Sequence, residues 1–156
     1  MKNIFGILLL GFLSACATPM AREQFRNDLL EAAFRHHVLP NAERDGAVFL
    51  SVYGSNDEEI DPPEDVMMRL SDLPFPVRPA SKARRLKEIL LRDIVDPQTG
   101  KYAVIFKVRI EKINNKKAKV WFYRDYGSLN ADGYETEAVF ENGKWNFIDT
   151  GRGSVS

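Results

Sequence analysis

The alternation of apolar and polar residues in the C-terminal half is the feature that most constrains how this chain folds. Between residues 102 and 113 the apolar side chains mostly occupy even positions, while charged ones such as Lys107 and Arg109 occupy odd positions. The same parity recurs over residues 118–126 and 134–141. A period of two residues is typical of a strand that buries one face. The pattern therefore predicts three consecutive antiparallel strands of a meander.

The turns between these strands fix how the strands pair. Asn142-Gly143 is typical of a two-residue hairpin turn, and it places Phe140 opposite Trp145 in a fourth strand. In the turn between the first two strands, even positions stay beside even positions only if the loop holds an odd number of residues, most simply 114–116. The even-numbered side chains, together with Trp145 and Phe147, are then predicted to form one buried face.

The N-terminal half begins with a helical pattern. From about residue 20 to Val38 the apolar residues recur at spacings of three and four, with charged residues between them. This spacing predicts an amphipathic helix that ends at Pro40. Residues 47–53 are rich in residues that favour strands and stop at Gly54, so a strand is predicted there.

Less regular sequence joins this strand to the meander. Asp61 is expected to cap a short helix that starts at Pro62 or Pro63, with Glu64 in the capping-box position. The prolines that follow predict an extended connector. Residues 86–95 fit either a helix or a strand, and we favour a strand because a turn sequence leads from them directly into the next strand.

This order of elements predicts an α+β fold, in which an N-terminal helix packs on a bent antiparallel sheet with a C-terminal β-meander. The pattern resembles the cystatin-like and nuclear-transport-factor-like rolls. It also resembles small bacterial envelope proteins that end in a Gly-Lys-Trp hairpin, here residues 143–145. The resemblance implies a long helix in the concavity of the sheet, and it assigns no chemistry to any residue.

The first residues have the layout of an export signal. Lys2 precedes a ten-residue apolar run over residues 4–13, and the small residues Ser14 and Ala15 follow. The run is well short of the roughly 20 residues that a helix needs to cross a bilayer. The segment is therefore interpreted as a signal that is removed, and not as a membrane span.

Within this segment, Leu13-Ser14-Ala15-Cys16 resembles the lipobox of bacterial lipoproteins. The resemblance implies diacylglycerol on the thiol of Cys16, cleavage before that residue and acylation of the new amino terminus. It divides the chain into a signal peptide (1–15), a lipidated tether (16–22) and one domain (23–156). Ala17, in place of an aspartate, implies the outer membrane. Cys16 is the only cysteine, which fits a lipidated thiol, although an ordinary secretory signal is the alternative.

Composition and motifs narrow the classes of function. Loss of residues 1–15 removes Lys2 and no acidic residue, leaving 21 Lys and Arg against 22 Asp and Glu. A net charge near −1 gives no case for nucleic-acid binding. The motifs of serine hydrolases, zinc proteases, P-loop proteins and dinucleotide-binding proteins do not occur in the sequence. We therefore expect no cofactor or metal, and favour a membrane-anchored, non-enzymatic binding module.

The titratable residues leave one enzymatic alternative. His36 and His37 are neighbours, so on a helix their side chains point about 100° apart and do not converge on one metal ion. His37 is expected to contact the sheet, and a small roll-type enzyme would use either histidine with a carboxylate in a pocket. The acidic residues between Asp57 and Asp65 do not match a calcium-binding loop and are interpreted as a solvated loop and a helix start.

Cations and aromatic side chains share the odd-numbered face of the predicted meander. The candidate binding residues on this face are Lys107, Arg109, Lys119, Trp121 and Tyr123. Such a surface suits an envelope protein or an anionic glycan, through charge, stacking and cation–π contacts. The alternative is a solvated face of cross-strand partners, with Arg109 opposite Trp121 and Glu137 opposite Tyr123.

Overall fold

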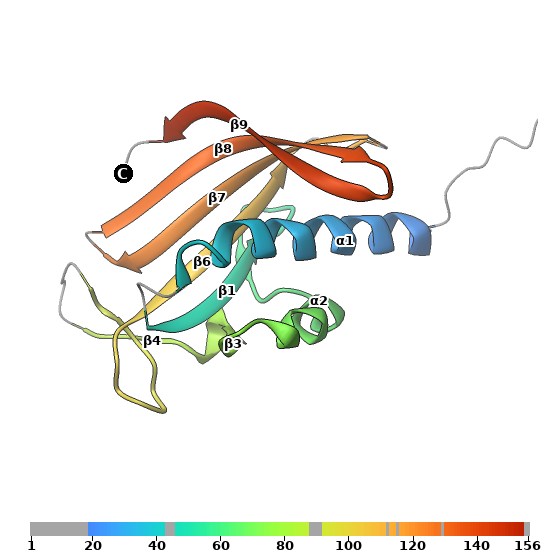
Figure 1. Ribbon diagram of the computed structural model, residues 1–156. Coiled ribbons are helices and arrows are strands. Elements are labelled where there is room, and N and C mark those ends of the chain that lie inside the picture. The colour runs from blue at the N-terminus through green and yellow to red at the C-terminus, as the bar shows by residue number, and fades with distance from the viewer. Residues whose placement is uncertain are drawn as a thin grey trace, which may run out of the picture.

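The computed structural model describes residues 19–42, 46–87, 92–111, 113–114, 116–128 and 130–154. Figure 1 shows a long helix, α1 (Pro19–Val38), lying along one face of a twisted sheet, with α2 (Glu64–Arg69) near its edge. The lipobox and Cys16 lie outside the described residues. Helix α1 already includes residues 19–22, which were assigned to the tether.

The sheet is mostly antiparallel and ends in a meander, which confirms the predicted α+β class. Its order is β2-β1-β6-β7-β8-β9, with β3 also beside β1, while β4 and β5 pair separately. The strands are β1 (Ala47–Tyr53), β2 (Glu59–Ile60), β3 (Val77–Pro79), β4 (Arg84–Arg85), β5 (Ile94–Val95), β6 (Ala103–Glu111), β7 (Lys117–Gly127), β8 (Asn130–Glu141) and β9 (Lys144–Ser154). Two short 3₁₀ segments, η2 (Leu70–Asp72) and η3 (Ala80–Lys82), complete the connection before β4.

The predicted register is confirmed between β6 and β7 and between β8 and β9. Phe140 lies opposite Trp145 across the β8–β9 turn, and Val108 lies opposite Phe122 between β6 and β7. At the turn, Asn142 and Gly143 both have positive φ angles, of 54° and 78°. That backbone is the one that two-residue hairpins favour, because its twist matches that of the strands.

The main core lies between α1 and the even-numbered face of the meander. Leu29, Ala33 and Phe34 of α1 have no exposed surface. The sheet contributes buried residues from four strands, namely Val48, Leu50, Val104, Phe106, Val108, Ala118, Val120, Phe122 and Ala138. The side chains that recur every two residues in the strands thus pack against those that recur every three or four residues in the helix.

The connection between β1 and β6 differs from the predictions in two places. The Asp61 carboxylate does not cap α2, since it accepts bonds from the backbone N–H of Ser81, at 2.9 Å, and from its hydroxyl. The predicted strand over residues 86–95 is also wrong in extent, since among its described residues only Ile94 and Val95 form a strand. They pair with Arg84 and Arg85, where no strand was predicted.

The odd-numbered face of the sheet carries a second, smaller core. Phe49, Ile94, Ala103 and Ile105 form this cluster, and Ala80 and Ala83 pack against it. Residues 80–83 and β5 therefore cover the part of this face near the start of β6. Of the candidate binding residues, Arg109, Lys119, Trp121 and Tyr123 lie further along β6 and β7, beyond this cover.

The core assignment predicts the effect of truncating Phe122, which is fully buried. Phe122→Ala should lower the free energy of unfolding by roughly 3–5 kcal/mol, because it removes apolar contacts and leaves a cavity. Urea denaturation monitored by circular dichroism measures the change. Ile148→Ala is the matched control, since Ile148 is 52% exposed, and it should change stability by less than about 0.5 kcal/mol. A larger loss of stability for Ile148→Ala than for Phe122→Ala would show that the faces of the sheet are assigned the wrong way round, and equal losses would contradict the core assignment.

Candidate functional site

Aromatic side chains form a row on the odd-numbered face of the sheet. Trp121 and Tyr123 are nearly parallel, with ring centroids 6.2 Å apart and planes 15° apart. Tyr53 of β1 meets Tyr123 edge-on at 5.7 Å. We call these three residues the aromatic platform. Tyr123 is half-buried, and burial raises the pKa of its hydroxyl.

The platform exists because of how three strands pair. β1 runs parallel to β6, with Ser51 opposite Lys107, so the odd positions of β1 share a face with the odd positions of β6. Gly133 lies opposite Tyr123, and a Cβ atom there would lie 2.7 Å from the Tyr123 ring. The tyrosine ring therefore lies against backbone that only glycine leaves open.

Cations flank the platform, and acidic groups already accompany them. The Arg109 guanidinium lies 4.4 Å from the Tyr53 ring centroid and pairs with Asp57 at 3.2 Å. The Lys119 ammonium lies 5.3 Å from the Trp121 ring centroid. It pairs with Glu135 at 2.7 Å, and this hydrogen bond is the main cause of its raised pKa.

Lys107 was predicted to lie on this open face, and that prediction is wrong. The side chain is buried, with only 8% of the residue exposed, and its ammonium contacts Glu59 at 2.6 Å and Asp125 at 2.8 Å. Burial opposes its charge, but the hydrogen bonds to the two carboxylates outweigh burial and raise its pKa. Lys107 therefore belongs to the interior and cannot meet a partner.

Asp125 extends this contact into a charge network that reaches from the interior to the exposed side chain of Arg85. Arg85 of β4 bonds to Asp125 and also contacts Asp93 at 3.3 Å. Asp93 accepts the backbone N–H of Ser128 at 2.9 Å, and its pKa is lowered because this bond, the Ser128 hydroxyl and Arg85 together outweigh burial. The network thus ties the segment that covers the second core to β6 and β7.

The cross-strand pairs predicted for the solvated alternative are right in one case and wrong in the other. Arg109 lies opposite Trp121, as predicted. Glu137 lies opposite Lys119, and not opposite Tyr123, which faces Gly133. The predicted register was right for β6 and β7, but the offset of β8 could not be derived without the length of the β7–β8 turn.

Two members of the site were not found in the sequence. Tyr53 and Asp57 join the face only because β1 pairs with β6 and the chain then turns back into β2. Residues 47–53 gave only a weak signal for membership of this face, namely the polar hydroxyl of Tyr53 at an odd-numbered position. The parallel pairing itself has no local signal, because it is made across a long connection.

His37 contacts the sheet, as expected. Its Nε2 lies 3.2 Å from the carbonyl oxygen of Tyr123, and its Nδ1 lies 3.4 Å from the Tyr134 hydroxyl. Burial lowers its pKa to about 4, so the ring is neutral at pH 7. Nε2–H then donates to the carbonyl, and the hydroxyl donates to Nδ1. The enzymatic alternative required a carboxylate at such a nitrogen, and both nitrogens of His37 face other groups.

His36 lies at the surface. Its ring stacks on Phe147 with centroids 4.6 Å apart and planes 18° apart. The two histidines therefore differ in burial, one exposed and one in the core, although both rings contact Phe122, at 5.7 Å and 4.7 Å between centroids.

The acidic residues between β1 and α2 have separate partners. Asp57 pairs with Arg109, Glu59 with Lys107, and Asp65 with Arg69 at 3.1 Å. Among the described residues, no group of three or more His, Cys, Asp or Glu side chains is arranged to hold a metal ion.

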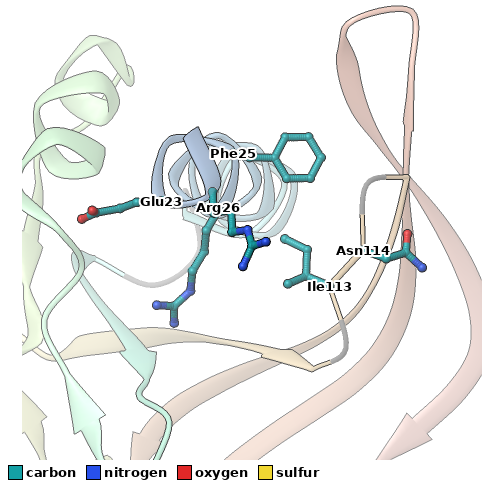
Figure 2. A pocket seen from close by; sticks show the side chains of 6 residues that line it. Glu23, Phe25, Arg26, Ile113 and Asn114 are labelled. Carbon is teal, nitrogen blue, oxygen red and sulfur yellow. The ribbon is translucent and has the colours of Figure 1, made fainter. Parts of the chain in front are cut away.

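Two cavities lie away from the platform. One, of about 480 Å³, lies between β2 and η3 and is lined by Glu59, Asp61, Ser81 and Arg85 among others. All four of these polar side chains already make the contacts described above. The other cavity, of about 580 Å³, lies at the N-terminal end of α1, where Figure 2 shows Phe25 and Arg26 beside Ile113 and Asn114 of the β6–β7 turn.

Comparison of the chain with protein-family models, curated proteins and solved structures finds no match. Within the part of the chain that the structure describes, none of the helices is long and apolar enough to cross a membrane.

The neutral, buried state of His37 predicts a pH dependence of stability. The unfolded residue titrates near 6.5 and the folded one near 4, so the unfolded chain binds the extra proton first as pH falls. The contribution is complete above pH 6.5 and is lost as pH falls toward 4. We expect the free energy of unfolding to be about 2 kcal/mol lower at pH 5 than at pH 7.

Urea midpoints at the two pH values measure this effect. His37→Gln should flatten the dependence while lowering stability at pH 7, whereas His36→Gln, at the exposed neighbour, should leave the slope unchanged. A slope carried by His36, or no slope in the unmodified chain, would contradict the assignment.

Proposed function

We propose that this chain is an envelope lipoprotein whose folded domain binds a protein partner through the aromatic platform and its flanking charges. The observation that carries the proposal is the parallel Trp121–Tyr123 pair with Arg109 beside it, outside the segment that covers the second core. Trp, Tyr and Arg are the residues that most often dominate binding energy at protein interfaces.

The charges favour a protein over an anionic glycan. Arg109 and Lys119 each have acidic neighbours, so the face carries alternating charges and no net positive field. An anionic glycan gains most from unpaired cations in a field of one sign. A protein partner can instead match alternating charges at the rim while it covers the rings at the centre.

The anchor is proposed from the sequence alone. The lipobox Leu13-Ser14-Ala15-Cys16 supports lipid on Cys16, and Ala17 supports the outer membrane as the destination. Two or three acyl chains hold a protein at a bilayer stably, whereas one chain holds it only marginally. The domain would then meet its partner at a membrane surface.

Lipidation of Cys16 is tested by labelling cells with a clickable palmitate analogue. The unmodified protein should carry the label and Cys16→Ser should not, because the thioether can form only on the thiol. Mass spectrometry of the N-terminal peptide should find acylated Cys16 as the first residue. An unlabelled protein, or one with an N-terminus elsewhere, would overturn the anchor.

The destination has its own control within the same experiment. Ala17→Asp should keep the label but move the protein to the inner-membrane fraction, because lipoproteins with aspartate after the lipidated cysteine are retained there. Equal distribution of the two forms would contradict the outer-membrane assignment.

Partner binding is tested by placing a photo-crosslinking amino acid at position 121 in cells. We expect a discrete protein adduct that is absent when the same group replaces Met68, which is 63% exposed on α2. For the isolated partner, Arg109→Ala with Trp121→Ala should weaken binding at least about 30-fold, as expected for the loss of hot-spot residues.

The double substitution should lower the free energy of unfolding by less than Phe122→Ala does, because both residues are half-buried and lie on the face opposite the main core. Crosslinked adducts to a glycan, and none to a protein, would show that the partner is a glycan and would contradict the proposed protein partner. A folded double variant that binds its partner unchanged would show the face to be only the solvated side of the sheet.

A further inference from the structure

The cavity at the N-terminal end of α1 combines two cations with an apolar floor. Its lining is Arg22, Glu23, Phe25, Arg26, Ile113 and Asn114. Figure 2 looks nearly along α1 and shows Phe25 and Ile113 on one side of the helix, while the Glu23 carboxylate extends away on the other side. The side that faces the β6–β7 turn therefore presents arginine and apolar surface together.

The two arginines are available to a ligand. Arg22 and Arg26 are exposed, and neither makes an ion pair with any residue that the structure describes. This sets them apart from Arg35, Arg69, Arg85 and Arg109, each of which pairs with at least one carboxylate. Guanidinium groups bind phosphate with two parallel hydrogen bonds, which a lysine ammonium cannot do.

The apolar floor is held in place by the core. Phe25 contacts Phe140 at 5.1 Å and Trp145 at 4.9 Å between ring centroids. Ile113 is 40% exposed, and Met20, one turn before the cavity, is 80% exposed. Exposed apolar side chains beside unpaired arginines are typical of surfaces that lie at a membrane interface.

The proposed anchor places this end of the domain at the bilayer. Only three positions separate Cys16 from Pro19, where α1 begins, so the chain can span at most about 11 Å between them. Side chains on a helix tilt toward its N-terminus, which for Arg22 and Arg26 is the direction of the lipid. Their guanidinium groups thus lie within reach of the headgroup layer.

We infer that this cavity binds the phosphodiester of an anionic phospholipid and so orients the domain on its membrane. The inference rests on the lipidation of Cys16 that is proposed above. The acyl chains supply the attachment, while Arg22 and Arg26 hold the phosphate and Phe25 and Ile113 contact the glycerol region. Because α1 and the aromatic platform lie on opposite faces of the sheet, this orientation leaves the platform free for its partner.

The test uses the lipidated chain in vesicles of phosphatidylcholine alone, or with about one third phosphatidylglycerol. Hydrogen exchange of the peptide that covers the first two turns of α1 is the readout. We expect slower exchange only with phosphatidylglycerol. Arg22→Gln with Arg26→Gln should reduce that protection by about 25-fold, since each cation near an anionic surface contributes about fivefold.

Lys82→Gln with Arg84→Gln is the matched control. It removes the same charge from exposed positions near β4, at the other end of the molecule in Figure 1, and should leave the protection unchanged. Equal loss in the control, or protection in phosphatidylcholine alone, would overturn the headgroup site. Full protection of the detergent-solubilised chain by glycerol 3-phosphate would show that the cavity binds a free phosphate compound, and would contradict a lipid headgroup as the ligand. A chain without lipid would fail earlier, at vesicle insertion, which distinguishes failure of the anchor from failure of the cavity.

Discussion

The packing of α1 against the even-numbered side chains of the meander is the interaction on which the rest of the structure depends. Near the C-terminal end of α1 this packing includes His37, which meets Phe106 edge-on at 5.0 Å and Phe122 at 4.7 Å. A histidine in this place must be neutral, and two hydrogen bonds satisfy its nitrogens, so it serves the core as a polar aromatic ring. Because the helix occupies one face of the sheet, any surface for a partner on the sheet must lie on the other.

That other face is divided by buried charge. Buried ion pairs cost free energy to desolvate, so the Lys107–Asp125 pair contributes less to stability than its short contact suggests. The charge network does define where the covering segment ends. Gly127 shows how closely this border is packed, since a Cβ atom there would lie 2.6 Å from the backbone nitrogen of Asp93. Beyond the border the sheet is open, and the aromatic platform begins.

How much of this arrangement the sequence predicted depends on how far apart in the sequence the interacting residues lie. Register between β6 and β7 and between β8 and β9 depends on short turns, so Arg109, Trp121 and Tyr123 could be assigned to one face from parity. The burial of Lys107 depends on Glu59 of β2 and Asp125 of β7, which distant pairings bring together. The position of Tyr53 in the platform and the contact of Asp61 with Ser81 likewise depend on the long connection between β1 and β6. No local pattern encodes these contacts.

The pairing of the two cations beside the platform, Arg109 and Lys119, affects how a partner can be recognised there. An uncharged partner must displace water from Arg109 and Lys119, while both cations stay paired with their acidic neighbours. Exposed ion pairs of this kind contribute little free energy. Affinity would then come from covering Trp121 and Tyr123, and specificity from matching the order of the charges around them. Arg22 and Arg26, which make no ion pair with a described residue, lie instead at the end of α1, where a membrane, and not a folded partner, is the expected source of negative charge. Stacking at one surface and charge at the other would allow the two proposed contacts to form independently.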